Sequence, residues 1–181
     1  TQFSPIDANV IEAMQRAKVI VRYGIGVDNV DLEAAKKKGI PVCNIPDYCI
    51  DEVADHTLAF ILATTRQVIP NTLNIRAGQW GLATSLDAMR TLRDQTVGII
   101  GFGRIGREVA ARLLPFKCRR LVYDAFVPAD TVRSLGCEPV SQEQLLTQCD
   151  IVTLHCPSTP QTRKLLNTTS IALMKRGSIV V

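Results

Sequence analysis

The chain has 181 residues, of which 46% are hydrophobic and 21% are charged, and its formal net charge at pH 7 is +4. This is the composition of a globular protein long enough for one full hydrophobic core or two small ones. Its apolar runs, such as 59–63, are far shorter than the roughly 20 residues that span a bilayer, and no signal-peptide pattern opens the chain. We therefore expect a cytoplasmic protein with no membrane association.

Basic residues and cysteines exclude two further classes of protein. The bases are scattered, and their single run, 36–38, falls at the end of a predicted helix, where cations suit the helix dipole. The six cysteines contain no Cys-x-x-Cys pair, which favours reduced, buried thiols over a zinc site or a disulfide framework. Neither a nucleic-acid partner nor a metal is expected.

The first segment alternates helices with short strands. Helices are predicted over 8–17 and from an Asp31 cap through Lys38, and strands over 19–22 and 41–44. This alternation is typical of a parallel α/β unit.

A helical region without strands follows. The sequence predicts a long, mostly buried helix over 51–67 and a further helical stretch that leads to Gly78. Trp80, the one tryptophan, is expected to anchor packing between segments. Polar residues up to Asp94 then mark a domain boundary.

From Thr96 the alternation of strand and helix resumes, which predicts an open, doubly wound parallel α/β sheet. Strands are expected at 97–100, 120–124, 138–140, 151–154 and 178–181, and helices at 104–114, 129–134, 142–148 and 168–174.

A Gly-x-Gly-x-x-Gly motif follows the strand at 97–100 and opens the next helix. Gly101 permits a tight turn, Gly103 allows the backbone to approach a pyrophosphate, and Gly106 allows close packing of helix against strand. The alternative interpretation is a structural turn from strand to helix that binds no ligand. Because the next strand ends in Asp124, the motif predicts a bound dinucleotide.

Asp124 also indicates which dinucleotide is bound. A carboxylate at this position accepts a hydrogen bond from the ribose 2′-hydroxyl of NAD and repels the 2′-phosphate of NADP. A nearby arginine can accommodate that phosphate, but Arg119 and Arg120 are expected to face solvent. NAD is therefore the predicted cofactor.

Two further segments lie where ligands bind in such sheets, beyond the carboxyl ends of strands. His155 follows the strand at 151–154 and has two interpretations: a general base, or a residue that lines the cofactor pocket by backbone and packing contacts. In the first segment, the glycines of 24–29 can expose N–H groups to a small carboxylate or form a plain turn.

Motifs along nearly the whole chain resemble those of the D-isomer-specific 2-hydroxyacid dehydrogenases. They are the segments 22–31, 43–46, 53–58, 101–106, 154–157 and 174–178, in the order in which that family has them. Residues 44–47 and 53–55 are similar to the branch with the C-terminal-binding proteins and phosphoglycerate dehydrogenases. The resemblance implies a flavodoxin-like substrate domain and a Rossmann cofactor domain, with ligands in the cleft between them, and a homodimer.

The resemblance also implies domains and roles for residues. Residues 1–94 would be part of a substrate-binding domain plus linking helices, and 95–181 an incomplete NAD-binding domain. The N–H groups of Ile25 and Gly26 would bind the carboxylate of a small 2-hydroxy or 2-oxo acid. The cofactor would contact Thr57, Gly101, Gly103, Arg104, Ile105, Gly106, Asp124, His155, Cys156, Pro157 and Thr162.

No residue of the chain is assigned a catalytic role. The family's arginine, glutamate and histidine are expected beyond Val181, so the sequence is expected to be an excerpt of a longer protein, inactive alone. The resemblance predicts an NAD-dependent oxidoreductase acting on D-2-hydroxy acids. The alternatives are a dimeric, NAD-sensing protein of the corepressor type and an inactive fragment.

Overall fold

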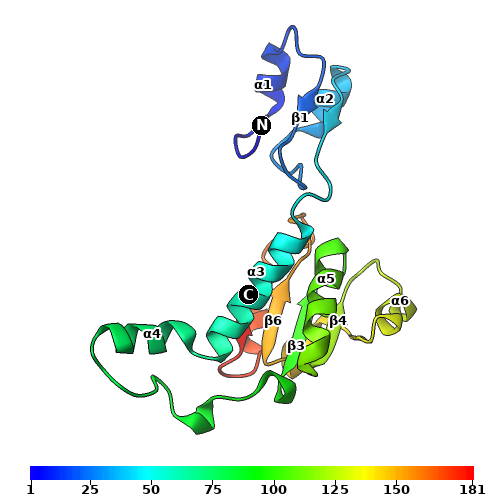
Figure 1. The fold of residues 1–181 in the computed structure, drawn as a ribbon. Coiled ribbons are helices and arrows are strands. Elements are labelled where there is room, and N and C mark those ends of the chain that lie inside the picture. Colours follow the sequence, from blue (N-terminus) through cyan, green and yellow to red (C-terminus); the bar gives the residue numbers. More distant parts are fainter. The chain divides into compact units, whose positions relative to one another are not determined.

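The predicted alternation of helices and strands becomes two separate sets of parallel strands in the computed structural model, which describes residues 1–181 (Figure 1). The chain divides into two units, 1–49 and 50–181, and each is described by itself.

The first unit is a small α/β structure around two parallel strands. It contains α1 (Ala8–Ala13), β1 (Ile20–Val21), α2 (Leu32–Lys37) and β2 (Val42–Cys43), and β1 pairs with β2. The Asp31 carboxylate caps α2 by accepting from the Ala34 N–H at 2.9 Å, as predicted. Helix α1 ends four residues earlier than predicted. Residues 15–19 are exposed, so packing against a core does not stabilise a longer helix.

Two helices open the second unit. Helix α3 (Ile50–Thr65) buries one face, which includes Leu58 and Ile61, so the prediction of a mostly buried helix holds for that face only. Gln67 has a left-handed φ of 54° and separates α3 from α4 (Val68–Arg76), which buries no residue. Trp80 is 95% exposed. Its predicted packing role is wrong within this chain, because the segment after α4 stays on the surface.

The second unit is built on a five-stranded parallel sheet in the order β5-β4-β3-β6-β7. The order reverses direction on either side of β3, which confirms the predicted doubly wound fold. The strands are β3 (Thr96–Ile100), β4 (Arg119–Tyr123), β5 (Glu138–Pro139), β6 (Ile151–Leu154) and β7 (Ile179–Val180). The helices are α5 (Arg104–Leu113), α6 (Ala129–Ser134), α7 (Gln142–Gln148) and α8 (Thr168–Ala172), with short 3-10 turns at Leu86–Ala88, Leu92–Asp94 and Leu114–Phe116.

Hydrophobic cores cover both faces of this sheet, which explains why its central strands are almost wholly apolar. One core joins α3 and α5 to the sheet through residues such as Ile61 and Val109. The other joins α7 to the sheet through Leu145 and Val152. Because α3 packs on α5, the second structural unit begins at Ile50. The assignment of residues 1–94 to a substrate domain with its linking helices stays a prediction.

Arg120 corrects one expectation about the sheet. Its side chain is buried and donates to the carbonyl oxygens of Ala110 (2.9 Å) and Gly136 (2.8 Å). The prediction that Arg120 faces solvent is wrong, because the backbone on either side offers acceptors for a buried guanidinium. Its neighbour Arg119 is exposed, as predicted, and pairs with Glu138 at 2.6 Å.

None of the helices combines the length and the apolar character that a membrane span needs.

Candidate functional site

The carboxyl ends of β3, β4 and β6 meet at one edge of the sheet, where they enclose a cavity of about 380 Å³. Ligands of open parallel sheets bind at this edge. The cavity is lined by Ile100, Gly101, Gly103, Tyr123, Asp124, Ala125, Phe126, Gln142, His155, Cys156, Pro157, Thr159, Gln161, Thr162 and Leu165.

The three glycines of the motif meet different surroundings. Gly101 has a φ of +92°, and a Cβ added there would lie 2.5 Å from the Cys156 nitrogen. A Cβ on Gly106 would lie 2.1 Å from the Gly101 oxygen. A Cβ on Gly103, by contrast, would meet nothing within 4 Å. Gly101 and Gly106 are therefore required by the fold, whereas Gly103 leaves open space that suits a pyrophosphate.

Helix α5 begins beside Gly103 without a side-chain cap. The first turn of a helix has N–H groups with no partner inside the helix, and its dipole is positive at that end. Arg104 and Ile105 lie in this turn. The arrangement can therefore hold an anion.

Asp124 follows β4 and is held by three backbone donors. Its Oδ2 accepts from Phe102 N–H at 2.7 Å, and its Oδ1 accepts from the N–H groups of Phe126 (2.8 Å) and Val127 (3.0 Å). Burial acts to raise the pKa of Asp124, but these donors and the nearby Arg107 guanidinium outweigh it, so the pKa is lowered. The carboxylate is ionised, and Oδ2 keeps room for one more donor.

Residues 155–162 form the opposite wall of the cavity. The His155 N–H donates to the Ile100 oxygen at 2.7 Å, which holds this segment against the glycine turn. Thr162 shapes the loop that follows: its Oγ1 donates to the Pro157 oxygen at 2.5 Å and accepts from the Thr159 N–H at 2.8 Å.

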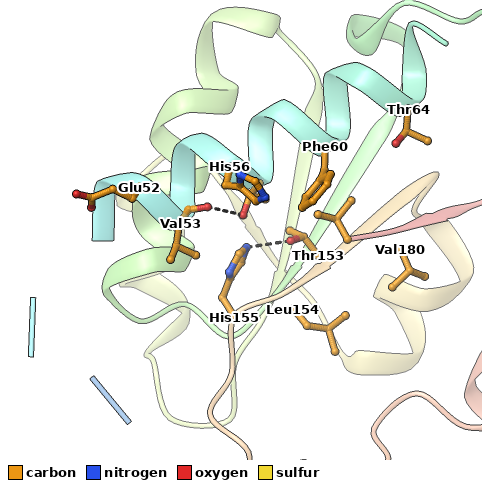
Figure 2. A pocket seen from close by; sticks show the side chains of 11 residues that line it. Glu52, Val53, His56, Phe60, Thr64, Thr153, Leu154, His155 and Val180 are labelled. Carbon is orange, nitrogen blue, oxygen red and sulfur yellow. Dashed lines mark hydrogen bonds between the residues drawn. The ribbon is translucent and has the colours of Figure 1, made fainter. Parts of the chain in front are cut away.

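The His155 ring lies beneath α3 and lines a second cavity of about 670 Å³ (Figure 2). Its Nε2 is 2.9 Å from Thr153 Oγ1. Burial lowers the pKa of His155 to about 4, so the ring is neutral at pH 7. This environment favours packing over a role as proton carrier. Thr57 lines the same cavity, and its Oγ1 donates to the Val53 oxygen at 2.8 Å.

Most of the predicted cofactor residues therefore come together. Gly101, Gly103, Asp124, His155, Cys156, Pro157 and Thr162 line one cavity, Arg104, Ile105 and Gly106 form the adjoining helix turn, and Thr57 lines the second cavity. Sequence reasoning missed several lining residues, among them Phe126 and Thr159. Phe126 is 94% exposed. Its position two residues after Asp124 is the one signal that points to it.

Ile25 and Gly26 lie in the first unit, in a loop after β1. Their N–H groups donate to no acceptor within the chain, and Asn44 Nδ2 fixes the loop by donating to the Ile25 oxygen at 2.7 Å. The Arg22 guanidinium lies against Gly24, where an added Cβ would be 1.3 Å from Nη1. Arg22 Nε is buried without a partner. Sequence reasoning missed this cation beside the loop.

Comparisons with known proteins decide the family. The model of the D-isomer specific 2-hydroxyacid dehydrogenase NAD binding domain matches residues 58–181. The chain belongs to this family. The matched residues form an NAD-binding domain, so NAD is the cofactor of this part of the chain. The cavity described above offers the open glycine and the carboxylate that are typical of a dinucleotide site.

Relatives align along almost the whole length of the chain. D-3-phosphoglycerate dehydrogenase of Methanocaldococcus jannaschii is 39% identical over 97% of the chain, and so is hydroxypyruvate reductase of Thermotoga maritima. The crystal structure of Aquifex aeolicus D-lactate dehydrogenase with NAD and lactic acid superimposes with a TM-score of 0.92 at 34% identity over 98% of the chain. The chain spans 33%, 56% and 53% of these three proteins, respectively.

Proposed function

We propose that the protein is an NAD-dependent oxidoreductase that interconverts a small D-2-hydroxy acid and its 2-oxo acid. The observation that carries this proposal is the cavity at the carboxyl edge of the sheet. There the uncapped start of α5, the open side of Gly103 and the Asp124 carboxylate converge. The names of the relatives, which are reductases and dehydrogenases of such acids, support the reaction class.

Each cofactor residue has a proposed task. The N–H groups of Gly103, Arg104 and Ile105 hold the pyrophosphate at the helix start, and Asp124 accepts from the adenosine ribose. Cys156, Pro157 and Thr162 line the path toward the nicotinamide. Residues 95–181 belong to the NAD-binding domain in this proposal.

The loop of Ile25 and Gly26 is the proposed carboxylate site, and 1–94 would be part of the substrate domain with its linking helices. Two free N–H groups on consecutive residues suit one carboxylate. The Arg22 guanidinium adds a positive charge that favours an anionic substrate.

Bound NAD supplies the acceptor or donor of the hydride exchanged at carbon 2. The chain's own residues hold the reactants and exclude water, and the apolar wall of the second cavity, with Phe60 and Val180, serves that exclusion. The arginine, glutamate and histidine that would polarise the carbonyl and move the hydroxyl proton stay predicted beyond Val181.

A homodimer is proposed through α4 and the segment that follows. This stretch exposes Ile69, Leu73, Trp80 and Leu86. Exposed apolar clusters of this kind mark interaction surfaces. A cytoplasmic location is also proposed, which the six free cysteines support.

The test is turnover by the full-length protein with NADH and a panel of 2-oxo acids that includes hydroxypyruvate, glyoxylate and pyruvate. We expect oxidation of NADH with at least one of them. Binding of NAD without turnover of any acid would instead support the corepressor-type alternative.

Asp124→Ala tests the cofactor assignment separately. Loss of a charge-assisted acceptor weakens NAD binding by about 10- to 100-fold and narrows the preference over NADP. Equal affinities for each cofactor before and after the substitution, measured by fluorescence titration, would contradict the assignment.

A further inference from the structure

A third cavity, with a polar lining, lies at the edge of the sheet opposite the cofactor cavity. Its volume is about 430 Å³. It is placed at the amino ends of β3, β6 and β7, so the length of a strand, roughly 15 Å, separates it from the glycine turn. Its lining residues are Thr64, Thr65, Gln67, Ala88, Arg90, Gln95, Asp150, Lys175, Arg176, Gly177, Ser178 and Ile179.

Asp150 organises the charges of this cavity. Its Oδ2 accepts from the Thr96 N–H at 2.8 Å, and its Oδ1 contacts both Arg90 Nη1 and Lys175 Nζ at 3.1 Å. Burial acts to raise the pKa of Asp150, but the Thr96 donor, Lys175 and Arg90 outweigh it and lower the pKa. The ionised carboxylate therefore gathers two cations around a single oxygen atom.

The cations exceed the acids that line the cavity. Arg176 is a third cation there, is exposed and has no acidic partner, and Asp150 is the single carboxylate among the lining residues. The formal charge of the lining is therefore +2. Like charges that line one cavity repel one another, and a bound anion would offset this repulsion.

Donors remain available for such an anion. Lys175 has three N–H groups and uses one for Asp150. Arg90 has five and uses one for Asp150 and one for the Asp94 oxygen, so both side chains keep donors. Arg176 adds a complete guanidinium fork, which matches the oxygens of a phosphoryl group.

We propose that this cavity binds a small dianion of the phosphate class, as free phosphate or as the phosphoryl group of a small metabolite. A phosphate carries about −1.5 to −2 charges at pH 7, which balances the lining. The ligand sits at the base of β3, β6 and β7, away from the cofactor, so it occupies a site distinct from that of the proposed reaction.

The test uses ¹⁵N-labelled chain titrated with sodium phosphate, with sodium chloride at the same ionic strength as reference. We expect saturable shifts of the Gly177 and Ser178 amide signals. Shifts that chloride reproduces, or that are confined to 102–106, where phosphate would imitate the cofactor, would overturn the proposal. Saturation by free phosphate supports that source, whereas saturation by glycerol phosphate alone would point to a phosphoryl ester.

Two matched variants complete the experiment. Arg176→Gln removes the cation that has no acidic partner, and Arg16→Gln removes an equal charge from an exposed site in the first unit. Arg176→Gln should weaken phosphate binding about tenfold or more, in the range of one charge-assisted hydrogen bond. Equal phosphate affinities of the two variants would overturn the proposal, and their remaining amide signals report that each is folded.

Discussion

At the scale of single residues, Gly103 and Gly106 belong to one motif but differ in the space around them. A Cβ on Gly106 would collide with the Gly101 oxygen at 2.1 Å, whereas one on Gly103 would enter open space. Sequence spacing predicted both glycines. Only the structure separates Gly106, which the fold requires, from Gly103, which leaves space beside the helix start.

The pair yields a matched prediction. Gly106→Ala should lower the free energy of unfolding by about 2 kcal/mol or more, because helix and turn must move apart. Gly103→Ala should unfold like the wild type yet bind NAD at least about tenfold more weakly, since the methyl group occupies the space for the pyrophosphate. Urea unfolding and NAD titration measure the two effects. Equal NAD affinity for Gly103→Ala and wild type would refute the pyrophosphate role.

His155 yields a prediction about pH. Its folded-state pKa of about 4 lies below the ordinary value of 6.5 because the ring is buried. Between these pH values the unfolded chain binds a proton at His155 that the folded chain excludes. Protonation therefore favours the unfolded state, so the free energy of unfolding is highest above pH 6.5 and falls as the pH drops toward 4.

Between pH 7.5 and pH 5 the wild type should therefore lose about 1 to 2 kcal/mol more stability than His155→Gln, which keeps a partner for Thr153. Urea unfolding at the two pH values measures the difference. Parallel losses in both proteins would show that His155 does not titrate in this range.

At the scale of elements, periodicity and caps predicted the strands of the second unit to within one or two residues. Valine and isoleucine runs fix β3 and β6, and Asp31 and Gly39 fix the ends of α2. The pattern failed where tertiary contacts decide. No local signal reveals that Arg120 finds two carbonyl acceptors, or that the segment with Trp80 stays on the surface.

One ion-pair cluster joins two of these elements. Arg112 of α5 contacts Asp51 and Asp55 of α3 at 2.5 and 2.6 Å, and Glu108 of its own helix at 2.7 Å. Hydrogen bonds to Asp51 and Asp55 are the main causes that raise the pKa of Arg112. The cluster therefore fixes α3, which carries Thr57, against the helix that opens at the glycine motif.

Arg112→Met should lower the free energy of unfolding by about 1 kcal/mol, since the side chain is partly exposed and meets three carboxylates. The loss should shrink in 1 M salt, where the Debye length is about 3 Å. Arg133→Met is the control, because Arg133 pairs with Asp130 alone on an exposed surface, and it should change stability by less than about 0.5 kcal/mol. Equal losses of unfolding free energy in the two variants would contradict a stabilising role of the Arg112 cluster.

At the scale of the whole molecule, the second unit uses the two edges of its sheet differently. The carboxyl edge collects the glycine turn, Asp124 and the 155–162 loop, whereas the amino edge collects cations around Asp150. The parallel arrangement produces this division, because every strand begins at one edge and ends at the other. Sequence motifs revealed the first edge alone, since the residues of the second are far apart in the chain.

Helix α4 exposes apolar side chains on the surface of this unit. It buries none of its own residues, and Ile69 and Leu73 are about 60% exposed. A hollow of about 530 Å³ lies at its junction with α3 and is lined by Phe60, Ile69 and Pro70, among others. Such a surface is costly in water, and the proposed homodimer would cover it with a second copy of the chain.

The wild type should therefore sediment as a dimer, and the double variant Ile69→Lys with Leu73→Lys should sediment as a monomer, because two charges cannot be buried unpaired in an apolar interface. Phe3→Lys, which changes an exposed apolar residue outside α4, should remain dimeric. Trp80 gives an independent readout, since it is the single tryptophan and is exposed in one copy of the chain. Its emission should shift to shorter wavelength as wild-type concentration rises and stay constant in the double variant. A wild type that sediments as a monomer at every concentration, with unchanged Trp80 emission, would contradict association through α4.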